Sequence, residues 1–239
     1  MTAHPDFHIE NRLLRGLPEA DLQLLLPKLR WIELKLRDTL YKPNEPIDYA
    51  YFPTSGICSV IAETATGVKS EVGIIGREGF VGAATVLYAD SAPFEVIVQV
   101  EGQALMIEKG ELQDTMIRSR ALMAALLRFI HVFSVQTTQT AVANALYSPV
   151  ERLARWLLMC QDRVDTPDFT MTHKFLAVML GVPGTGVTAA LTELESTNII
   201  AATKGRLAVL DRPALETIVR GAYGIPEREY ERLIDAPLS

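Results

Sequence analysis

Apolar and polar residues alternate in short runs between residues 31 and 110. The runs fall at positions 32–36, 49–52, 57–62, 68–75, 95–100 and 104–107, with turn-forming residues between them. Short strands at regular spacing are typical of an antiparallel sandwich or jelly roll. We therefore expect a β-roll over residues 31–110, preceded by a helical segment over residues 1–30.

The segment from residue 111 to about residue 147 has a different periodicity and contains neither proline nor glycine. Apolar and small side chains recur there every three or four positions, which predicts a long helix with a heptad seam. The seam consists of Leu122, Leu126, Phe129, Phe133, Gln136, Thr140 and Ala143. We expect residues 111–148 to form a dimerisation helix that pairs with a second copy through this seam. The alternative is a single amphipathic helix packed on its own domain.

Three further helices follow in the C-terminal third of the chain. Pro149 opens a helix over residues 149–161, and a short helix over 172–180 ends at Gly181. Pro183 then restarts the chain at a first helical position, and apolar positions 187, 191 and 194 mark the buried face of the third helix.

Two apolar runs complete this region and bracket a turn that contains Lys204 and Arg206. The runs, 199–202 and 207–210, predict a hairpin with a basic tip. Two helices, a tight turn and a hairpin form a winged helix-turn-helix over residues 149–212, a shape that enters the DNA major groove. The expected fold class is therefore α+β: an N-terminal antiparallel β-roll, a long helix, this winged helix-turn-helix, and a helical extension over residues 213–239.

The composition disfavours several classes of function but does not identify one. The formal net charge of −6 argues against a global attraction to nucleic acid, although one basic face would suffice. Cys58 and Cys160 lie far apart, and residues 31–110 contain no histidine, so we expect no metal site and no metal-dependent jelly-roll enzyme. His4 and His8 are spaced for chelation, but we expect them to be solvated.

The N-terminus lacks the pattern of a signal peptide, and the apolar stretch 121–135 is interrupted by Arg128 and His131. That stretch is too short to span a bilayer. We therefore expect a cytoplasmic protein with no membrane partner.

Several motifs resemble those of the Crp/Fnr family of bacterial transcription regulators. They are Arg-Leu-Ala-Arg-Trp-Leu-Leu at 152–158, the segment 172–181, Gly-Val-Thr at 186–188, Leu-Thr-Glu-Leu-Glu at 191–195 and Ile-Ile at 199–200, together with 52–56 and 71–82. The resemblance spans roughly residues 12–212. It implies a homodimer that binds an inverted-repeat DNA operator and is switched by a signal in the β-roll, with RNA polymerase as a further possible partner.

The sensor half departs from the members of this family that bind cyclic nucleotides. Those members hold the buried phosphate with an arginine, but here Ala83 and Ala84 follow Gly82, and no Arg or Lys occurs between Arg77 and Lys109. We therefore do not expect cyclic AMP to bind, and we expect no cofactor. An unknown small-molecule effector would occupy a pocket formed by Gly76, Arg77, Glu78, Gly79, Phe80, Val81, Gly82, Thr137 and Thr138.

The helix-turn-helix also differs from that of other members of this family. Family members open the recognition helix with side chains that reach base edges, whereas this chain has Pro-Gly-Thr-Gly at 183–186. The remaining candidates for DNA contact are His173, Lys174, Pro183, Gly184, Thr185, Thr188, Ala189, Thr192, Lys204 and Arg206. Most of them suit phosphate better than bases. We expect a DNA-binding regulator with weak base discrimination; the alternative is a degenerate member that acts through protein–protein contacts.

Overall fold

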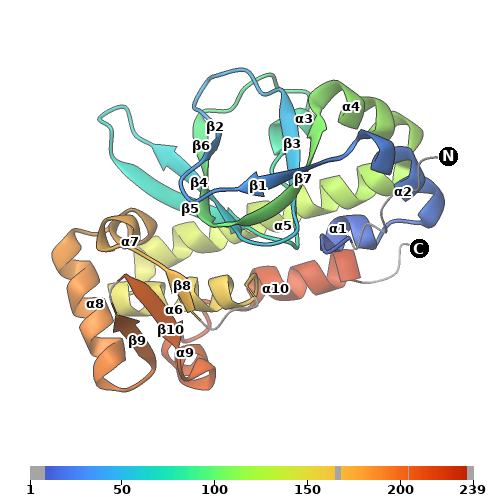
Figure 1. Ribbon diagram of the computed structural model, residues 1–239. Helices are drawn as coiled ribbons and strands as arrows, with labels where there is room; N and C mark the ends of the chain where they lie inside the picture. The colour runs from blue at the N-terminus through green and yellow to red at the C-terminus, as the bar shows by residue number, and fades with distance from the viewer. Residues whose placement is uncertain (1–8, 165–167, 204, 236–239) are drawn as a thin grey trace.

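The computed structural model describes residues 9–164, 168–203 and 205–235. Figure 1 shows a β-roll above, a long helix running beneath it, and a small α/β domain at the lower left. Three short helices precede the roll: α1 (Arg12–Arg15), α2 (Glu19–Leu25) and a 3₁₀ turn (Leu26–Lys28). The described part of residues 1–30 is therefore mostly helical. His4 and His8 lie outside them.

Two antiparallel sheets form the roll, as the alternating pattern predicts. One has the order β1-β7-β3 and the other β2-β6-β4-β5. Their strands are β1 (Arg30–Leu34), β2 (Thr39–Tyr41), β3 (Tyr49–Pro53), β4 (Ile57–Glu63), β5 (Lys69–Ile75), β6 (Phe94–Val100) and β7 (Gly102–Glu108), with α3 (Ala83–Val86) between β5 and β6. The three-residue strand β2 and the one-turn helix α3 are too short to leave a periodic signal.

The expected single helix from residue 111 is two helices. α4 (Lys109–Arg118) ends before Ser119, and α5 (Arg120–Leu146) begins after it. Ser119 has extended backbone angles, and its hydroxyl accepts a hydrogen bond from the Leu122 N–H at 3.0 Å. Serine is a favoured N-cap because its side chain satisfies a free N–H at a helix start. The break lets α4 pack near β7 and α3 while α5 runs along the roll.

The heptad seam of α5 faces the chain's own β-roll, which corrects the predicted dimer interface. Leu122, Leu126, Phe129, Gln136 and Ala143 are buried in the single chain, and Gln136 Oε1 accepts the Ile74 N–H at 2.7 Å. Phe133 packs against Gly73, where even a Cβ atom would lie only 2.8 Å from its ring. Thr140 is half-buried and donates to the carbonyl of Gln136. For this face of the helix the alternative prediction, an amphipathic helix packed on its own domain, is therefore the right one.

The C-terminal domain has the predicted helices and one strand more. α6 (Pro149–Gln161) starts at a capping box between Ser148 and Glu151, and α7 (His173–Leu180) ends at Gly181 with φ +56°. α8 (Gly184–Ser196) follows directly, with Pro183 as the N-cap instead of the first helical residue. The hairpin strands β9 (Ile200–Thr203) and β10 (Arg206–Val209) are joined by β8 (Asp168–Thr170) in the order β8-β10-β9.

The C-terminal extension leaves this domain and returns to the long helix. α9 (Arg212–Ile218) packs on α6, whereas α10 (Ile225–Tyr230) and a π-helical turn (Glu231–Asp235) lie along α5 (Figure 1). Arg128 donates to the carbonyl of Leu233 at 3.2 Å, and Tyr230 is buried in the core beneath the roll. The extension therefore bridges the C-terminal domain to the sensor half.

Among the described residues, α5 is long and apolar enough to cross a membrane by length and composition alone. The apolar stretch 121–135 covers only part of this helix, because α5 continues to Leu146. A core helix passes the same test, so a single helix of this kind is weak support for a membrane span. One face of α5 is already covered by the β-roll.

Candidate DNA-binding surface and sensor cavity

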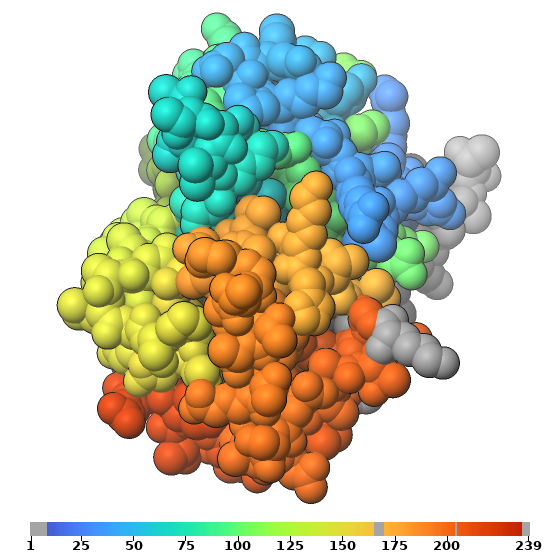
Figure 2. All heavy atoms as spheres, turned by 90° about the vertical axis from the view of Figure 1, so that its left-hand side faces the viewer, coloured from blue at the N-terminus to red at the C-terminus, as the bar shows by residue number. Residues whose placement is uncertain are grey.

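The second helix of the helix-turn-helix, α8, has one buried face and one exposed face. Val187, Ala190, Leu191 and Leu194 are buried in the domain core. The exposed residues at the start and along the free face are Pro183, Gly184, Thr185, Thr188, Ala189 and Thr192. In Figure 2, which faces this side, the orange residues of the helix-turn-helix form the lower front surface. The structure thus gathers all six predicted α8 contacts on one exposed face.

The basic candidates come from other elements of the same domain. His173 and Lys174 are exposed in the first turn of α7, whose N-cap Thr172 accepts the Phe175 N–H at 3.2 Å. Arg206 is exposed at the start of β10, and Lys204 lies outside the described residues. Side chains of this kind, with free N–H groups at helix starts, suit a phosphate backbone.

This surface has few side chains that could recognise individual bases. The sequence of α8 contains no Arg, Lys, Asn or Gln, which are the residues that make bidentate contacts to purines. The Thr188 hydroxyl donates to the carbonyl of Gly184 at 3.1 Å, within the helix. Methyl groups of Thr and Ala189 can meet thymine methyls. The arrangement can hold DNA through its backbone and offers little direct discrimination among bases.

The cavity inside the β-roll is nearly filled by aromatic rings. It measures about 30 Å³. The rings of Phe80 and Phe129 lie 5.5 Å apart and those of Phe129 and Phe133 6.4 Å apart, and Tyr41 also lines the space. Ligand pockets usually measure hundreds of cubic ångströms, so a nucleotide cannot enter this cavity without displacing the aromatic side chains.

Only part of the predicted effector pocket lines this cavity. Phe80, Val81 and Gly82 do so. Gly79 packs against the Phe129 ring, and the Gly76 N–H donates to the Glu78 carboxylate. Residues 76–79 therefore make contacts outside this cavity: Gly76 and Glu78 contact Arg163, the Arg77 carbonyl accepts the Arg12 N–H, and Gly79 packs on α5.

The remaining predicted sensor residues make local contacts. Thr137 and Thr138 both donate to the carbonyl of Ser134 on their own helix and do not line the roll cavity. Cys58 is a small buried residue of the core, and burial raises the pKa of its thiol to about 12. An inert, protonated thiol of this kind is a structural residue.

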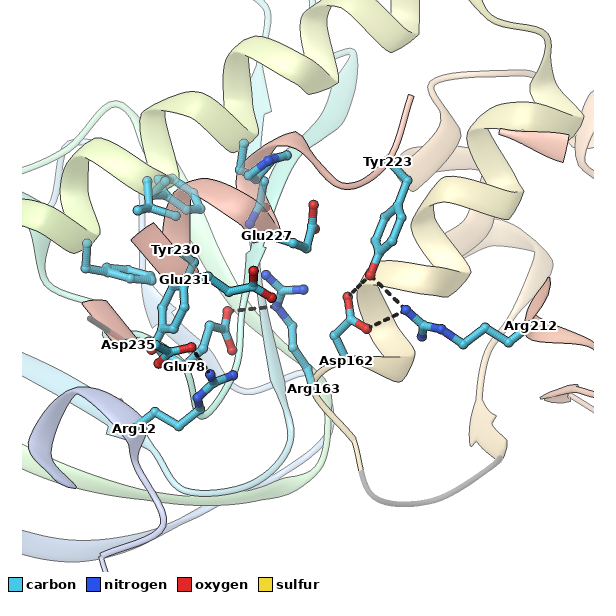
Figure 3. A pocket seen from close by; sticks show the side chains of 15 residues that line it. Arg12, Glu78, Asp162, Arg163, Arg212, Tyr223, Glu227, Tyr230, Glu231 and Asp235 are labelled. Atoms are coloured by element: carbon cyan, nitrogen blue, oxygen red, sulfur yellow. Dashed lines mark hydrogen bonds and ion pairs between the residues drawn. The ribbon is translucent and has the colours of Figure 1, made fainter. Parts of the chain in front are cut away.

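An ion-pair network at the junction of the two halves was not predicted from the sequence (Figure 3). Arg163, just after α6, donates through Nε to Glu78 of the roll at 2.8 Å, and both side chains are nearly buried. Arg163 and Glu78 line a separate cavity at this junction, which Figure 3 shows, and at its rim Arg12 pairs with Asp235 at 2.7 Å. Arg212, also at the rim, pairs with Asp162 at 3.0 Å and donates to the Tyr223 hydroxyl at 2.9 Å. Its guanidinium group therefore already has partners within the chain.

A second buried contact joins the roll to α6. The Trp156 indole N–H donates to Glu71 Oε1 at 3.0 Å, and the hydroxyl of Ser59 lies 2.6 Å from Glu71 Oε2. Burial raises the pKa of Glu71 to about 8, although these hydrogen bonds and the positive charges of Arg155 and Arg163 act to lower it. A carboxyl group at this position is therefore mostly protonated at neutral pH.

Two family models match the chain. The model of the cyclic nucleotide-binding domain matches residues 31–119, and the model of the Crp-like helix-turn-helix domain matches residues 151–218. No curated protein sequence matches the chain. The two matched regions coincide with the β-roll and with the helix-turn-helix described above.

Solved structures with the same fold are numerous. A transcriptional regulator of the Crp/Fnr family from Eubacterium rectale has 15% identity and a TM-score of 0.69, with 89% of this chain and 99% of that chain covered. The c-di-GMP-responsive regulator CLP of Xanthomonas campestris has 18% identity and a TM-score of 0.65, with 81% and 100% covered. FixK2 of Bradyrhizobium japonicum has 13% identity and a TM-score of 0.66, with 80% and 96% covered.

Both halves, their order and their fold agree with one group of proteins, whose members regulate transcription and are not enzymes. The C-terminal half is a DNA-binding helix-turn-helix domain. The chain belongs to the Crp/Fnr family of transcriptional regulators.

Proposed function

We propose that this protein is a cytoplasmic, homodimeric regulator that holds an inverted-repeat DNA site mainly through phosphate contacts and does not respond to cyclic AMP. The observation that carries the proposal is the exposed face of α8, which is free of carboxylates from Pro183 to Thr192, in a domain that also exposes Lys174 on α7 and Arg206 on β10. Such a face is compatible with DNA although the whole chain is acidic.

The exposed face of α5 supports a dimer through a different set of residues from the heptad seam. Met123, Leu127 and Val142 of α5 are exposed in the single chain, and Leu127 is 44% exposed. Ile130 borders this stripe and is half-buried, because it also packs against the roll core and lines the roll cavity. Positions 123, 127, 130 and 134 follow the spacing of four, three and four residues at which two helices pair. A second copy of α5 would remove this apolar stripe from water.

Leu127→Glu is therefore expected to weaken the dimer by about 30-fold, or about 2 kcal/mol, because it places a charge in an apolar helix pair. The monomer should keep its fold, since Leu127 is exposed within the chain. Sedimentation velocity over a concentration series measures the change. Val68→Glu, at an exposed apolar residue in the β4–β5 turn, is the matched control. An unchanged dimer in Leu127→Glu would contradict an interface on this face.

The roll cavity supports the absence of a cyclic AMP response. A cavity of about 30 Å³ has no room for a nucleotide, and no basic side chain lines it. Burying a phosphate there would leave its charge without a partner. Any effector of this protein would have to bind elsewhere, and RNA polymerase contact would not require one.

DNA binding is tested by fluorescence anisotropy with an inverted-repeat duplex and a scrambled duplex at two salt concentrations. We expect binding to both, with a preference of less than about 100-fold for the inverted repeat and no change on adding cyclic AMP. Lys174→Gln should weaken both complexes to the same extent and reduce the salt slope by about one per protomer.

Three outcomes would contradict the proposal. Absence of binding to either duplex would favour the degenerate member that acts through protein contacts. A preference of several thousandfold would show base readout that the α8 surface does not suggest. A shift in affinity with cyclic AMP would contradict the filled sensor cavity.

A further inference from the structure

A groove of about 430 Å³ lies between the β-roll and the helix-turn-helix. The outer face of the sheet containing β4 and β6 forms one wall, and α7 with the end of β8 forms the other. Figure 2 shows the two halves meeting on this side, with the blue-green residues of the roll directly above the orange domain. The groove has the volume of pockets that hold small organic ligands, which the roll cavity lacks.

The interior of the groove is apolar. The residues that give it this character are Leu36, Ile61, Ile97, Met171, Phe175 and Val178, contributed by both halves of the chain. Ile61 and Met171 are buried, whereas Ile97, Phe175 and Val178 remain partly exposed along the groove. An apolar ligand lying here would cover these three side chains and gain their burial.

A buried polar group without a partner lines the same groove. Gln99 is 2% exposed, and its Nε2 has no hydrogen-bond partner in the part of the chain that the structure describes. Its Oε1 is hydrogen-bonded to the Ser59 hydroxyl, which also lies 2.6 Å from Glu71. Since Ser59 has one proton, a protonated Glu71 donates to Ser59 and Ser59 donates to Gln99. This chain fixes the amide so that its NH₂ group is the end that lacks an acceptor.

The charged side chains of the groove carry a surplus of two positive charges. Lys69 is paired with Glu95 at 2.7 Å. Arg37 and Lys174 have no acidic partner among residues 9–164, 168–203 and 205–235. The backbone of Arg37 lies beside β6, because its N–H donates to the carbonyl of Val98 at 2.9 Å. Arg37 and Gln99 both line the groove, from these two neighbouring segments.

We propose that this groove binds an apolar monocarboxylate, with the carboxylate at Gln99 Nε2 and Arg37 and the apolar body along Ile97, Phe175 and Val178. A carboxylate supplies the two acceptors that these donors need. A neutral apolar molecule would leave the amide unpaired, and a nucleotide would bury polar groups against an apolar wall. Fatty acids and arylalkanoic acids share the required chemistry. The proposal concerns ligand binding alone and does not depend on the DNA-binding proposal.

Isothermal titration of the full-length protein tests the proposal with decanoate, 4-phenylbutyrate and decanol. We expect decanoate to bind with a dissociation constant on the order of tens of micromolar, and decanol at least about tenfold more weakly because it lacks the charge. 4-Phenylbutyrate distinguishes the two sources: tighter binding than decanoate indicates an aromatic acid, and weaker binding a fatty acid. Either result supports the site.

Variants locate the site. Arg37→Gln, at an exposed residue whose replacement should not disturb folding, is expected to weaken decanoate about tenfold and leave decanol unchanged. Val178→Trp fills the groove and should abolish binding of both, whereas Val68→Trp, at an exposed site outside the groove, should leave both unchanged. Absence of decanoate binding below millimolar concentrations would overturn the proposal. So would equal affinity of the wild type and Arg37→Gln for decanoate.

Discussion

Replacing Arg163 by Ala is expected to lower the free energy of unfolding by about 3–5 kcal/mol. Arg163 Nε donates to Glu78 Oε1 at 2.8 Å, and its NH1 donates to the carbonyl of Met159 at 2.7 Å. Side-chain exposure is only 8% for Arg163 and 12% for Glu78. Removing the guanidinium leaves the Glu78 carboxylate buried with the Gly76 N–H as its remaining donor. Urea denaturation at neutral pH measures the loss.

Two controls separate this effect from a general weakening of the junction. Asp235→Asn removes the partner of Arg12 at the rim of the same cavity, where both side chains are more than one-third exposed. Its cost should stay below about 1 kcal/mol, because water screens exposed ion pairs. The double variant Glu78→Leu/Arg163→Met should recover most of the stability, since no buried charge is left. Equal costs for Arg163→Ala and Asp235→Asn would contradict a desolvated pair at the junction.

Local signals explain why the C-terminal domain could be predicted almost residue by residue. Ser148 and Glu151 form a capping box that fixes the start of α6, and Gly181 takes the left-handed conformation that ends α7. These features depend on residues three or four positions apart. The strand β8 escaped prediction because three residues carry no usable periodicity, and the strand depends on pairing with β10.

The seam of α5 shows what a one-dimensional pattern leaves open. The spacing of Leu122, Leu126 and Phe129 predicts a buried face but does not identify the surface that buries it. The structure covers this face with the roll of the same chain, and a second apolar stripe around Leu127 stays exposed. A helix with two apolar faces can pack one face on its own chain and the other on a second copy. The sequence does not tell which face takes which role, and the tertiary structure is needed to decide it.

Part of the candidate site could likewise be predicted from the sequence, and part of it could not. The exposed positions of α8 follow from its helical period, so their common face could be predicted from Val187 and Leu191 alone. The pairs Glu78–Arg163 and Glu71–Trp156 could not, because each joins residues 85 positions apart on different domains. Three arginines, at positions 152, 155 and 163 in the apolar helix pattern of 150–163, were the only local hint, since a buried arginine requires a partner.

Glu71→Gln is expected to make stability less dependent on pH, by about 3 kcal/mol between pH 5.5 and pH 8. The pKa of Glu71 is raised by burial from 4.5 to about 8 in the folded chain. Between these values the unfolded chain loses the proton and the folded chain keeps it. The wild type is therefore most stable below pH 4.5 with respect to this group and loses that stability as the pH rises to about 8. Each pH unit in the window contributes about 1.4 kcal/mol.

The glutamine variant has no such ionisation, so its stability relative to the wild type should increase steadily with pH. Glutamine can still accept the Trp156 N–H and bond to Ser59, which limits the loss of contacts. Urea denaturation of both proteins at pH 5.5, 6.5, 7.5 and 8 gives the difference at each point. Asp90→Asn is the control: Lys109 lowers the pKa of Asp90, so this carboxylate is ionised in the folded and the unfolded chain, and the variant should show a difference that does not change with pH over this range. A constant difference for Glu71→Gln as well would mean that Glu71 is ionised in the folded protein. The roll and α6 would then be joined by a buried carboxylate held by Arg155 and Trp156 rather than by a neutral hydrogen-bond chain.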